Sequence, residues 1–311
     1  MLMTYDQTVG MIASGKPLHI AGDADLLRKL PMGNWIGGTT QRFMTREGGK
    51  VSRDMLFVTA FDYVGFTVKS YTTDEIRHVA KDAYDSGFTV VIVPYDSHVH
   101  HEYAQSAPGF LDMFIKNVVG WVAESLTVNG LNGETYNDKA VALHLETPAN
   151  KTVTIGNINI FEPDKDSPVI EFFQEGFMVY TCLVDGKKVT FADYIKDNGI
   201  DTKLPLVGDY CGSGVNISIK SIENGIVTLY APVFAGIKYR IAKGVSDYER
   251  EFNERLADFD GGNVIFSCNC ILNFLYGGLE GKSIGVFEGP VTYGEIAYQL
   301  VNQTLVYVMT E

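Results

Sequence analysis

The sequence predicts an α/β or α+β fold, built as two α/β halves whose mixed β-sheets are flanked by helices. Three observations support this prediction. Strand-like and helix-like segments intermingle along the whole chain. The 311 residues are 46% hydrophobic and 20% charged, which is ordinary for globular domains. The length suits about two domains. We therefore expect domains at 1–162 and 163–311, divided at the charged, proline-containing stretch EPDKDSP, with 147–151 as the alternative boundary.

The first half supplies the clearest helix and strand patterns. The segment 4–14 (TYDQTVGMIAS) reads as a helix closed by Gly15. Thr72 and Glu75 have capping-box spacing and predict the start of a second helix. The β-branched run 88–95 (FTVVIVPY) is typical of a strand that is buried on both faces.

The second half is richer in strands, which are short and separated by turn residues. Ser246 and Glu249 form another capping-box pattern and predict a helix over 247–259. The segment 263–270 (NVIFSCNC) reads as a strand, and 270–278 as a helix that follows it directly.

Charge and composition exclude several classes of partner. The net charge is −13, from 25 Lys+Arg against 38 Asp+Glu, which disfavours binding to nucleic acid or to an anionic membrane surface. No leader peptide and no membrane-spanning run is recognisable. The four cysteines suit a reducing compartment. We therefore expect a cytoplasmic protein, and no motif in the sequence calls for a cofactor.

Two histidines offer a possible metal site. His98 and His100 follow the predicted strand 88–95 and would share one face if the chain stayed extended. Two imidazoles and a carboxylate can hold zinc, but a third ligand would have to come from elsewhere. A solvated loop is the simpler interpretation, and metal binding is retained as an alternative.

Cys268 raises the possibility of nucleophilic chemistry. It lies near the end of the predicted strand 263–270, just before a helix, where a helix N-terminus would lower the thiol pKa. A thiol-dependent hydrolase or transferase is therefore an alternative function. A buried structural cysteine is the other interpretation. A catalytic role for Cys268 stays open as the alternative, and we prefer a non-catalytic role for the protein.

The C-terminal region concentrates glycines around polar and aromatic groups. Gly285, Gly289 and Gly294 bracket Tyr293 and Glu295. A turn of this kind, with a carboxylate, a phenol and free backbone N–H groups, can hold a small zwitterion. The alternative is a glycine-rich connection in which Glu295 is solvated or caps a helix.

Parts of the sequence resemble FIST domains. Cys268, the run Tyr293-Gly294-Glu295-Ile296 and the run Asn302-Gln303-Thr304 are similar to the C-terminal part of those domains. The segment WIGGTT (35–40) is similar to the turn of their N-terminal part. The resemblance implies a sensory module that binds a small polar ligand, such as an amino acid, and passes a signal to a protein partner.

On this resemblance we expect the ligand to lie in a cleft between the two halves. Backbone and hydroxyl groups of 37–40 would bind its anionic group, Glu295 would meet an ammonium group, Tyr293 would wall the site and Cys268 would line its floor. The expected ligand-binding residues are Gly37, Gly38, Thr39, Thr40, Cys268, Tyr293, Gly294 and Glu295.

Overall fold

The structure is a computed structural model that describes residues 1–63, 65–148, 150–210, 213–257, 259 and 262–311. Its architecture is mostly β, with 44% strand and 17% helix in the described residues. The predicted helix-flanked α/β halves are therefore wrong, because sheets dominate the molecule. One reason is local: the Thr72–Glu75 capping contacts form, but only a short 3-10 turn at Ile76–His78 follows them.

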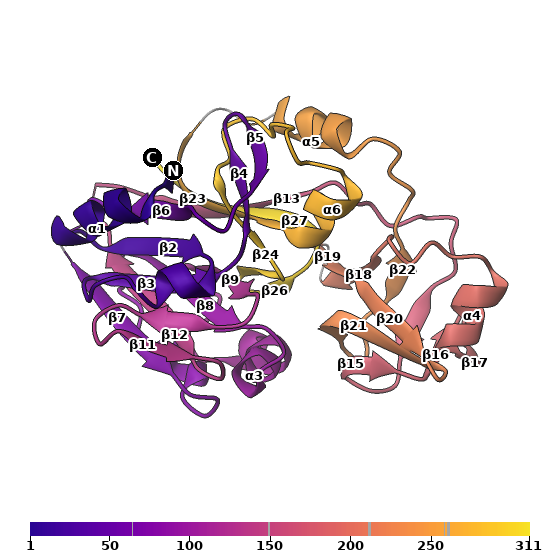
Figure 1. Ribbon diagram of the computed structural model, residues 1–311. Helices are drawn as coiled ribbons and strands as arrows, with labels where there is room; N and C mark the ends of the chain where they lie inside the picture. The colour runs from indigo at the N-terminus through magenta and orange to yellow at the C-terminus, as the bar shows by residue number, and fades with distance from the viewer. Residues whose placement is uncertain (64, 149, 211–212, 258, 260–261) are drawn as a thin grey trace.

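Three six-stranded sheets form the part of the molecule that we call the body (Figure 1). In spatial order, the first sheet contains β1 (Leu2–Met3), β6 (Leu56–Ala60), β2 (Leu18–Gly22), β3 (Trp35–Thr39), β10 (Thr127–Asn129) and β11 (Glu134–Tyr136). The second contains β26 (Gln299–Val301), β25 (Glu295–Ala297), β9 (Val118–Ala123), β8 (Gly87–Pro94), β12 (Ala140–Glu146) and β7 (Phe66–Tyr71). The third contains β13 (Val153–Asn159), β27 (Thr304–Thr310), β23 (Asn263–Cys270), β24 (Gly289–Thr292), β4 (Arg42–Thr45) and β5 (Gly48–Val51).

Two further sheets form a separate lobe, residues 170–241, at the right of Figure 1. The fourth sheet contains β17 (Lys187–Thr190), β16 (Thr181–Val184), β14 (Ile170–Phe172), β22 (Tyr239–Ile241), β18 (Leu206–Tyr210) and β19 (Ser213–Ile217). The fifth contains β15 (Gly176–Val179), β21 (Ile226–Val233) and β20 (Ile219–Glu223).

The helices are short and lie around the sheets. They are α1 (Tyr5–Ala13), α2 (Ala24–Leu27), α3 (His98–Ser106), α4 (Phe191–Asp197), α5 (Tyr248–Ala257) and α6 (Ile271–Tyr276), with a second 3-10 turn at Ala107–Gly109. The predictions for α1, α5, α6, β8 and β23 are confirmed at the level of element type. None of the described helices has the length and apolar character that crossing a membrane requires.

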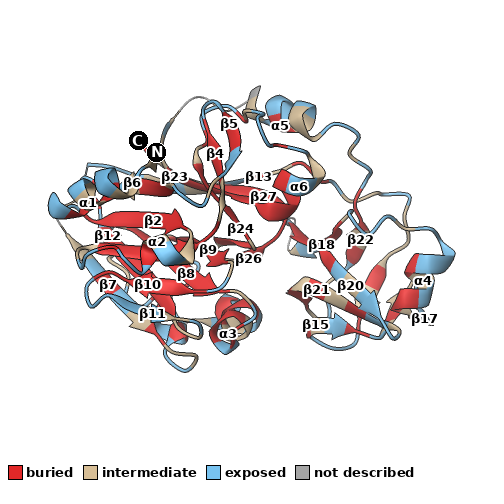
Figure 2. Cartoon of the chain, in the orientation of Figure 1, coloured by how far each residue is buried: buried red, intermediate tan, exposed pale blue. Residues whose placement is uncertain are grey.

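The first and second sheets pack face to face, and their facing strands are buried (Figure 2). Trp121 on β9 donates its ring N–H to His19 Nε2 on β2 at 2.8 Å, across the interface. Gly38 on β3 leaves room for this indole, because a Cβ there would lie 2.8 Å from the Trp121 ring and 2.7 Å from Ile92. The close approach of the two sheets therefore depends on a glycine at 38.

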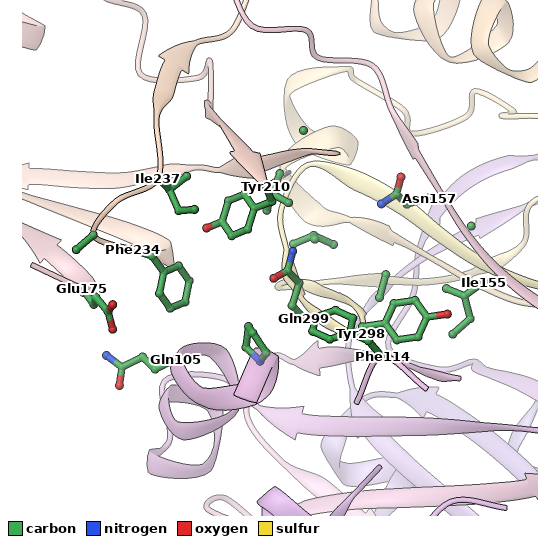
Figure 3. A pocket seen from close by; sticks show the side chains of 17 residues that line it. Gln105, Phe114, Ile155, Asn157, Glu175, Tyr210, Phe234, Ile237, Tyr298 and Gln299 are labelled. Atoms are coloured by element: carbon green, nitrogen blue, oxygen red, sulfur yellow. The ribbon is translucent and has the colours of Figure 1, made fainter. Parts of the chain in front are cut away.

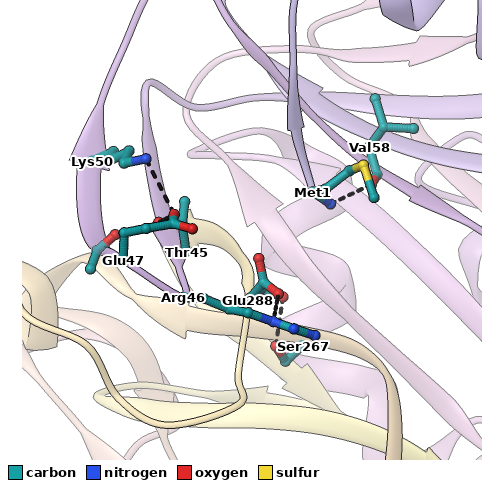
Figure 4. A network of polar contacts seen from close by, with 9 residues as sticks. Met1, Thr45, Arg46, Glu47, Lys50, Val58, Ser267 and Glu288 are labelled. Atoms are coloured by element: carbon teal, nitrogen blue, oxygen red, sulfur yellow. Dashed lines mark hydrogen bonds and ion pairs between the residues drawn. The ribbon is translucent and has the colours of Figure 1, made fainter.

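Within the sheets of the body, strands from the N-terminal part of the chain pair with strands from its C-terminal part. Glu295 on β25 pairs with Trp121 on β9, and Gly289 on β24 pairs with Met44 on β4. Figure 4 shows the second junction, where Arg46 forms an ion pair with Glu288 at 2.8 Å. Strands from both predicted domains, 1–162 and 163–311, thus pair within the same sheets of the body.

The lobe is an insertion between two strands of the body. β13 and β23 both pair with β27, and the chain leaves β13 for the lobe and returns into β23. The connecting segments run side by side, with Asp164 N donating to Ile241 O at 2.9 Å and Lys243 N to Glu162 O at 2.9 Å. The lobe is therefore attached to the body through two paired connections.

Gly38→Ala tests the sheet interface. We expect it to lower the free energy of unfolding by about 1–3 kcal/mol, because the added methyl group overpacks a filled core. Gly10→Ala is the control, because Gly10 lies on α1 with open space around it. Since alanine favours a helix over glycine, this variant should have a free energy of unfolding higher by up to about 1 kcal/mol. Chemical denaturation of both variants measures this difference. Equal stabilities would contradict the packing argument.

Candidate functional site

The residues predicted around 37–40 lie inside the body. Gly37, Gly38, Thr39 and Thr40 are all buried. The Thr39 hydroxyl accepts from the backbone N–H groups of Ser125 at 2.8 Å and Leu126 at 3.1 Å, whereas the Thr40 hydroxyl donates to Val291 O at 2.6 Å. These groups are therefore engaged by neighbouring strands and present no free donor to a ligand.

Glu295 is likewise internal, with no exposed surface. Its Oε1 accepts from the Thr292 hydroxyl at 2.8 Å, and its Oε2 accepts from the Thr304 hydroxyl at 3.2 Å. Burial raises the pKa of Glu295 to about 8 despite these hydrogen bonds. The interpretation of Glu295 as a solvated carboxylate is wrong, because three strands enclose it.

The other predicted residues of the C-terminal region surround this carboxyl. Gly294 is buried against Leu300 and Val122. Tyr293 is half-buried, and its hydroxyl donates to Glu124 Oε1 at 3.0 Å. Glu124 in turn donates its backbone N–H to Thr39 O at 2.8 Å. The structure thus brings the two predicted groups together, as part of the packed interior of the body.

Cys268 lies in the same interior, on β23. It is 1% exposed, and its thiol donates to Gly120 O at 3.5 Å. Burial raises the pKa of the Cys268 thiol well above its usual range, with the nearby Glu295 as a second cause. The residue at the N-cap of α6 is Cys270, two positions later. The proposed activation of Cys268 by a helix N-terminus therefore has no structural basis.

His98 and His100 do not form the predicted metal pair. The segment is helical, because Ser97 caps α3 by accepting from His100 N at 3.2 Å, so residues two apart point to different sides. His98 is exposed beside Asp138, whereas His100 is buried. In the part of the chain that the structure describes, no cluster of three metal-ligating side chains occurs.

A cavity of about 680 Å³ lies between the body and the lobe (Figure 3). The body contributes α3, the loop before β9 and the strands β13 and β26. The lobe contributes the end of β18, part of β19 and the segment 234–237 that follows β21. Its aromatic walls are Phe114, Tyr210, Phe234 and Tyr298, and its polar groups include Gln105, Asn157, Glu175 and Gln299. We call this space the first cavity.

A second cavity of about 450 Å³ adjoins it, and Gln105 and Glu175 line both. Its body side carries Tyr95, Asp96, His100 and His101, and its lobe side carries Phe177, Lys220 and Tyr230. The rings of His101 and Phe177 lie 4.7 Å apart, so the two parts of the molecule touch here. The two cavities together form the candidate site.

Sequence reasoning found His100 in this site, although for another role, and missed the remaining lining residues. One signal was available: Leu111, Phe114 and Ile115 place three large apolar side chains close together in a non-helical, exposed segment. Such exposure is typical of binding surfaces. The lobe side offered no comparable signal, because its lining residues are scattered over 175–237.

The fold and the site define a mostly β protein with an inserted lobe and a two-part cleft beside it. The chain matches, over residues 3–311, the model described as "Family of unknown function (DUF6976)", and it belongs to that family. No curated protein matches the sequence. The similarity to FIST domains stays a hypothesis.

The buried carboxyl predicts a pH dependence of stability. An unfolded Glu295 ionises near 4.5, whereas the folded protein holds the proton up to about pH 8. Between these values only the folded state binds the proton, so the contribution of Glu295 to the free energy of unfolding falls as pH rises, by up to about 1.4 kcal/mol per pH unit. Chemical denaturation from pH 5 to 8 measures this effect. The free energy of unfolding of Glu295→Gln, relative to that of the wild type, should rise with pH by the same slope.

The control for that measurement is Glu223→Gln, which changes an exposed glutamate of the lobe. Its stability difference from the wild type should stay constant over the same pH range. A constant difference for Glu295→Gln as well would show that the Glu295 carboxyl is ionised in the folded protein.

Alkylation distinguishes a structural Cys268 from a nucleophile. We expect iodoacetamide at pH 7.5 to leave Cys268 unmodified in the folded protein and to label it in guanidinium chloride, because the thiol is buried and protonated. Peptide mass spectrometry separates it from Cys182, Cys270 and Cys211, of which Cys211 lies outside the described residues. Rapid labelling of folded Cys268 would restore the catalytic alternative.

Proposed function

We propose that this protein is a ligand-binding module that holds a small molecule in the cleft between the body and the lobe. The observation that carries the proposal is the first cavity, with its volume of about 680 Å³ and its aromatic walls. Small-molecule sites are commonly concave spaces of 300–1,000 Å³ with apolar walls and a few polar groups. The first cavity has this size and this mixture of groups.

The aromatic walls come from both sides of the cleft. Phe114 lies 61% exposed on the body, with its ring 5.9 Å from that of Tyr298. Tyr210 and Phe234 belong to the lobe, and their rings lie 6.3 Å apart. A ligand between these two pairs of rings would remove water from the surfaces that it covers, which favours binding by about 25 cal/mol for each Å² of apolar surface buried.

A ligand held from both sides would also favour one spacing of the body and lobe. It can shift that equilibrium only by the difference between its affinities for the two states. This is how a sensory module would pass on ligand binding, and it agrees with the signalling role that the FIST resemblance implies. The cytoplasmic location and the signalling partner belong to the same proposal.

The test uses N-phenyl-1-naphthylamine, an uncharged aromatic probe that fluoresces strongly in apolar sites. Phe114→Ala and Phe234→Ala should each weaken probe binding about tenfold, the equivalent of about 1.4 kcal/mol. Fluorescence titration measures the dissociation constants. Phe114→Ala should leave the fold intact, because its side chain is largely exposed.

Leu111→Ala is the matched control. Leu111 lies in the same segment as Phe114 and is 63% exposed, but it does not line the first cavity. Its affinity for the probe should equal that of the wild type. Absence of probe binding to the wild type, or equal losses in all three variants, would overturn the proposed site.

A further inference from the structure

Strand β13 forms an edge of the third sheet and pairs with β27 alone among the described strands. Just before it, Thr152 and Glu311 exchange two backbone hydrogen bonds, at 3.2 and 3.1 Å, and the ladder continues in the same register. Hydrogen-bonded and non-hydrogen-bonded pairs alternate in an antiparallel ladder, so the backbone N–H and C=O groups of Ile155 and Asn157 point away from β27. Within the described part of the chain, these groups make no other backbone hydrogen bond. The edge of β13 is therefore free to pair with a further strand.

An edge of the lobe lies beside this one. Strand β19 ends the fourth sheet, and Asn216 on β19 meets Asn159 on β13, each side-chain amide donating to the other's Oδ1 at 2.9 Å. The backbone N–H of Asp209 on β18 donates to Lys238 O, toward β22. Asp209 is the ladder partner of Gly214, so the backbone groups of Gly214 point away from β18. The two edges thus meet through side chains at one end, and both present backbone groups beyond it.

The gap between the two edges opens into a cavity on each face of the third sheet. Ile155 lines the first cavity, as Figure 3 shows, and Tyr307 lines a further cavity of about 660 Å³, which we call the third cavity. Tyr307 is the ladder partner of Gly156, so its side chain and that of Ile155 point to opposite faces. Asn157 and Gly214 are exposed and line both cavities. The space between these two residues therefore continues from one face of the sheet to the other.

An extended peptide matches this arrangement. Where a peptide adds to a sheet edge, main-chain hydrogen bonds to every second residue of the edge supply affinity, and pockets for alternate side chains supply specificity. The β13 edge offers such main-chain groups at Ile155 and Asn157. Successive side chains of a strand point to opposite faces, and here each face has a cavity. A compact molecule in the first cavity alone would leave the β13 edge unpaired.

The linings of the two cavities favour apolar and basic side chains. The first cavity has aromatic walls, and Glu175 is the one charged residue among the described residues that line it. In the third cavity, Glu162 and Arg255 form an ion pair at 2.7 Å and so compensate each other's charge. We therefore expect apolar residues and a positive charge on the side of the peptide that faces the first cavity.

We propose that the ligand of the cleft is a short extended peptide, which enters the gap between β13 and β19 as a strand and pairs with the free edge of β13. Its alternate side chains occupy the first and the third cavity. This inference deepens the proposed function and depends on it, since it assigns the chemical class of ligand to the cleft.

The peptide acetyl-FTFTK-amide tests the assignment. In an extended conformation its phenylalanines and lysine share one face and its threonines the other. We expect it to displace N-phenyl-1-naphthylamine from the wild type, and isothermal titration calorimetry gives its dissociation constant. Two analogues carry one N-methyl group each, on the nitrogens of the second and third residues. These N–H groups point to opposite edges, so at least one analogue should bind about tenfold more weakly. Equal affinities of all three peptides, or binding without displacement of the naphthylamine, would overturn the inference.

Two variants of Asn157 connect peptide binding to the edge of β13. Asn157→Pro removes an N–H that points away from β27, and proline is tolerated at such edge positions because the existing ladder does not use that donor. We expect it to weaken peptide binding about tenfold. Asn157→Ala is the matched control, since it also removes the side chain but keeps the N–H, and its affinity should equal that of the wild type. Equal affinities of the two folded variants would contradict the pairing, and the methylated peptides carry the test should Asn157→Pro fail to fold.

The naphthylamine titration separates the two possible failures. If that probe binds as proposed and the peptide does not, the cleft is a ligand site and the peptide assignment is wrong. If neither binds, the proposed function itself is wrong. Sedimentation analysis covers a second copy of this chain as the occupant: a dimer that Asn157→Pro dissociates, without peptide binding to the wild type, would also overturn the inference.

Discussion

Strand β27 is the element on which the arrangement of the whole molecule depends. It pairs along its length with β13 and with β23, the two strands between which the chain leaves for the lobe. β13 ends opposite Thr304 and β23 begins opposite Thr310, so the two connections leave from opposite ends of β27. They come together further along, where Pro163 pairs with Ala242. Together with the ring contact between His101 and Phe177, this pairing holds the lobe beside the body. This constraint places the walls of the cleft opposite one another.

The same C-terminal region explains why the predicted binding residues are structural. Glu295 lies on β25 in the second sheet, whereas Thr292 ends β24 and Thr304 begins β27 in the third. The hydrogen bonds from both threonines to the Glu295 carboxyl therefore join two sheets. A buried carboxyl needs such partners, since an unpaired polar group in the interior is costly. The polar residues that suggested ligand contacts in the sequence are accounted for by this junction.

Local patterns predicted individual elements well and their partners poorly. The strands β8 and β23 and the helices α1, α5 and α6 follow from periodicity and capping residues. The pairing of β25 with β9 joins residues about 175 positions apart, and no local signal encodes it. The fold class was wrong for the same reason, because the sheets cover one another where helices were expected. The metal alternative required His98 and His100 to lie in an extended chain and the preferred interpretation was a solvated loop, whereas Ser97 caps a helix there.

The cleft itself follows from long-range geometry. A space between the two halves was expected, but residues such as Phe114 and Phe234 meet there only because the lobe returns beside the body. Gln105 and Glu175, one from each side, border both cavities. A ligand in one cavity thus changes the polar surroundings of the other, and contacts made at both would favour the same spacing of body and lobe.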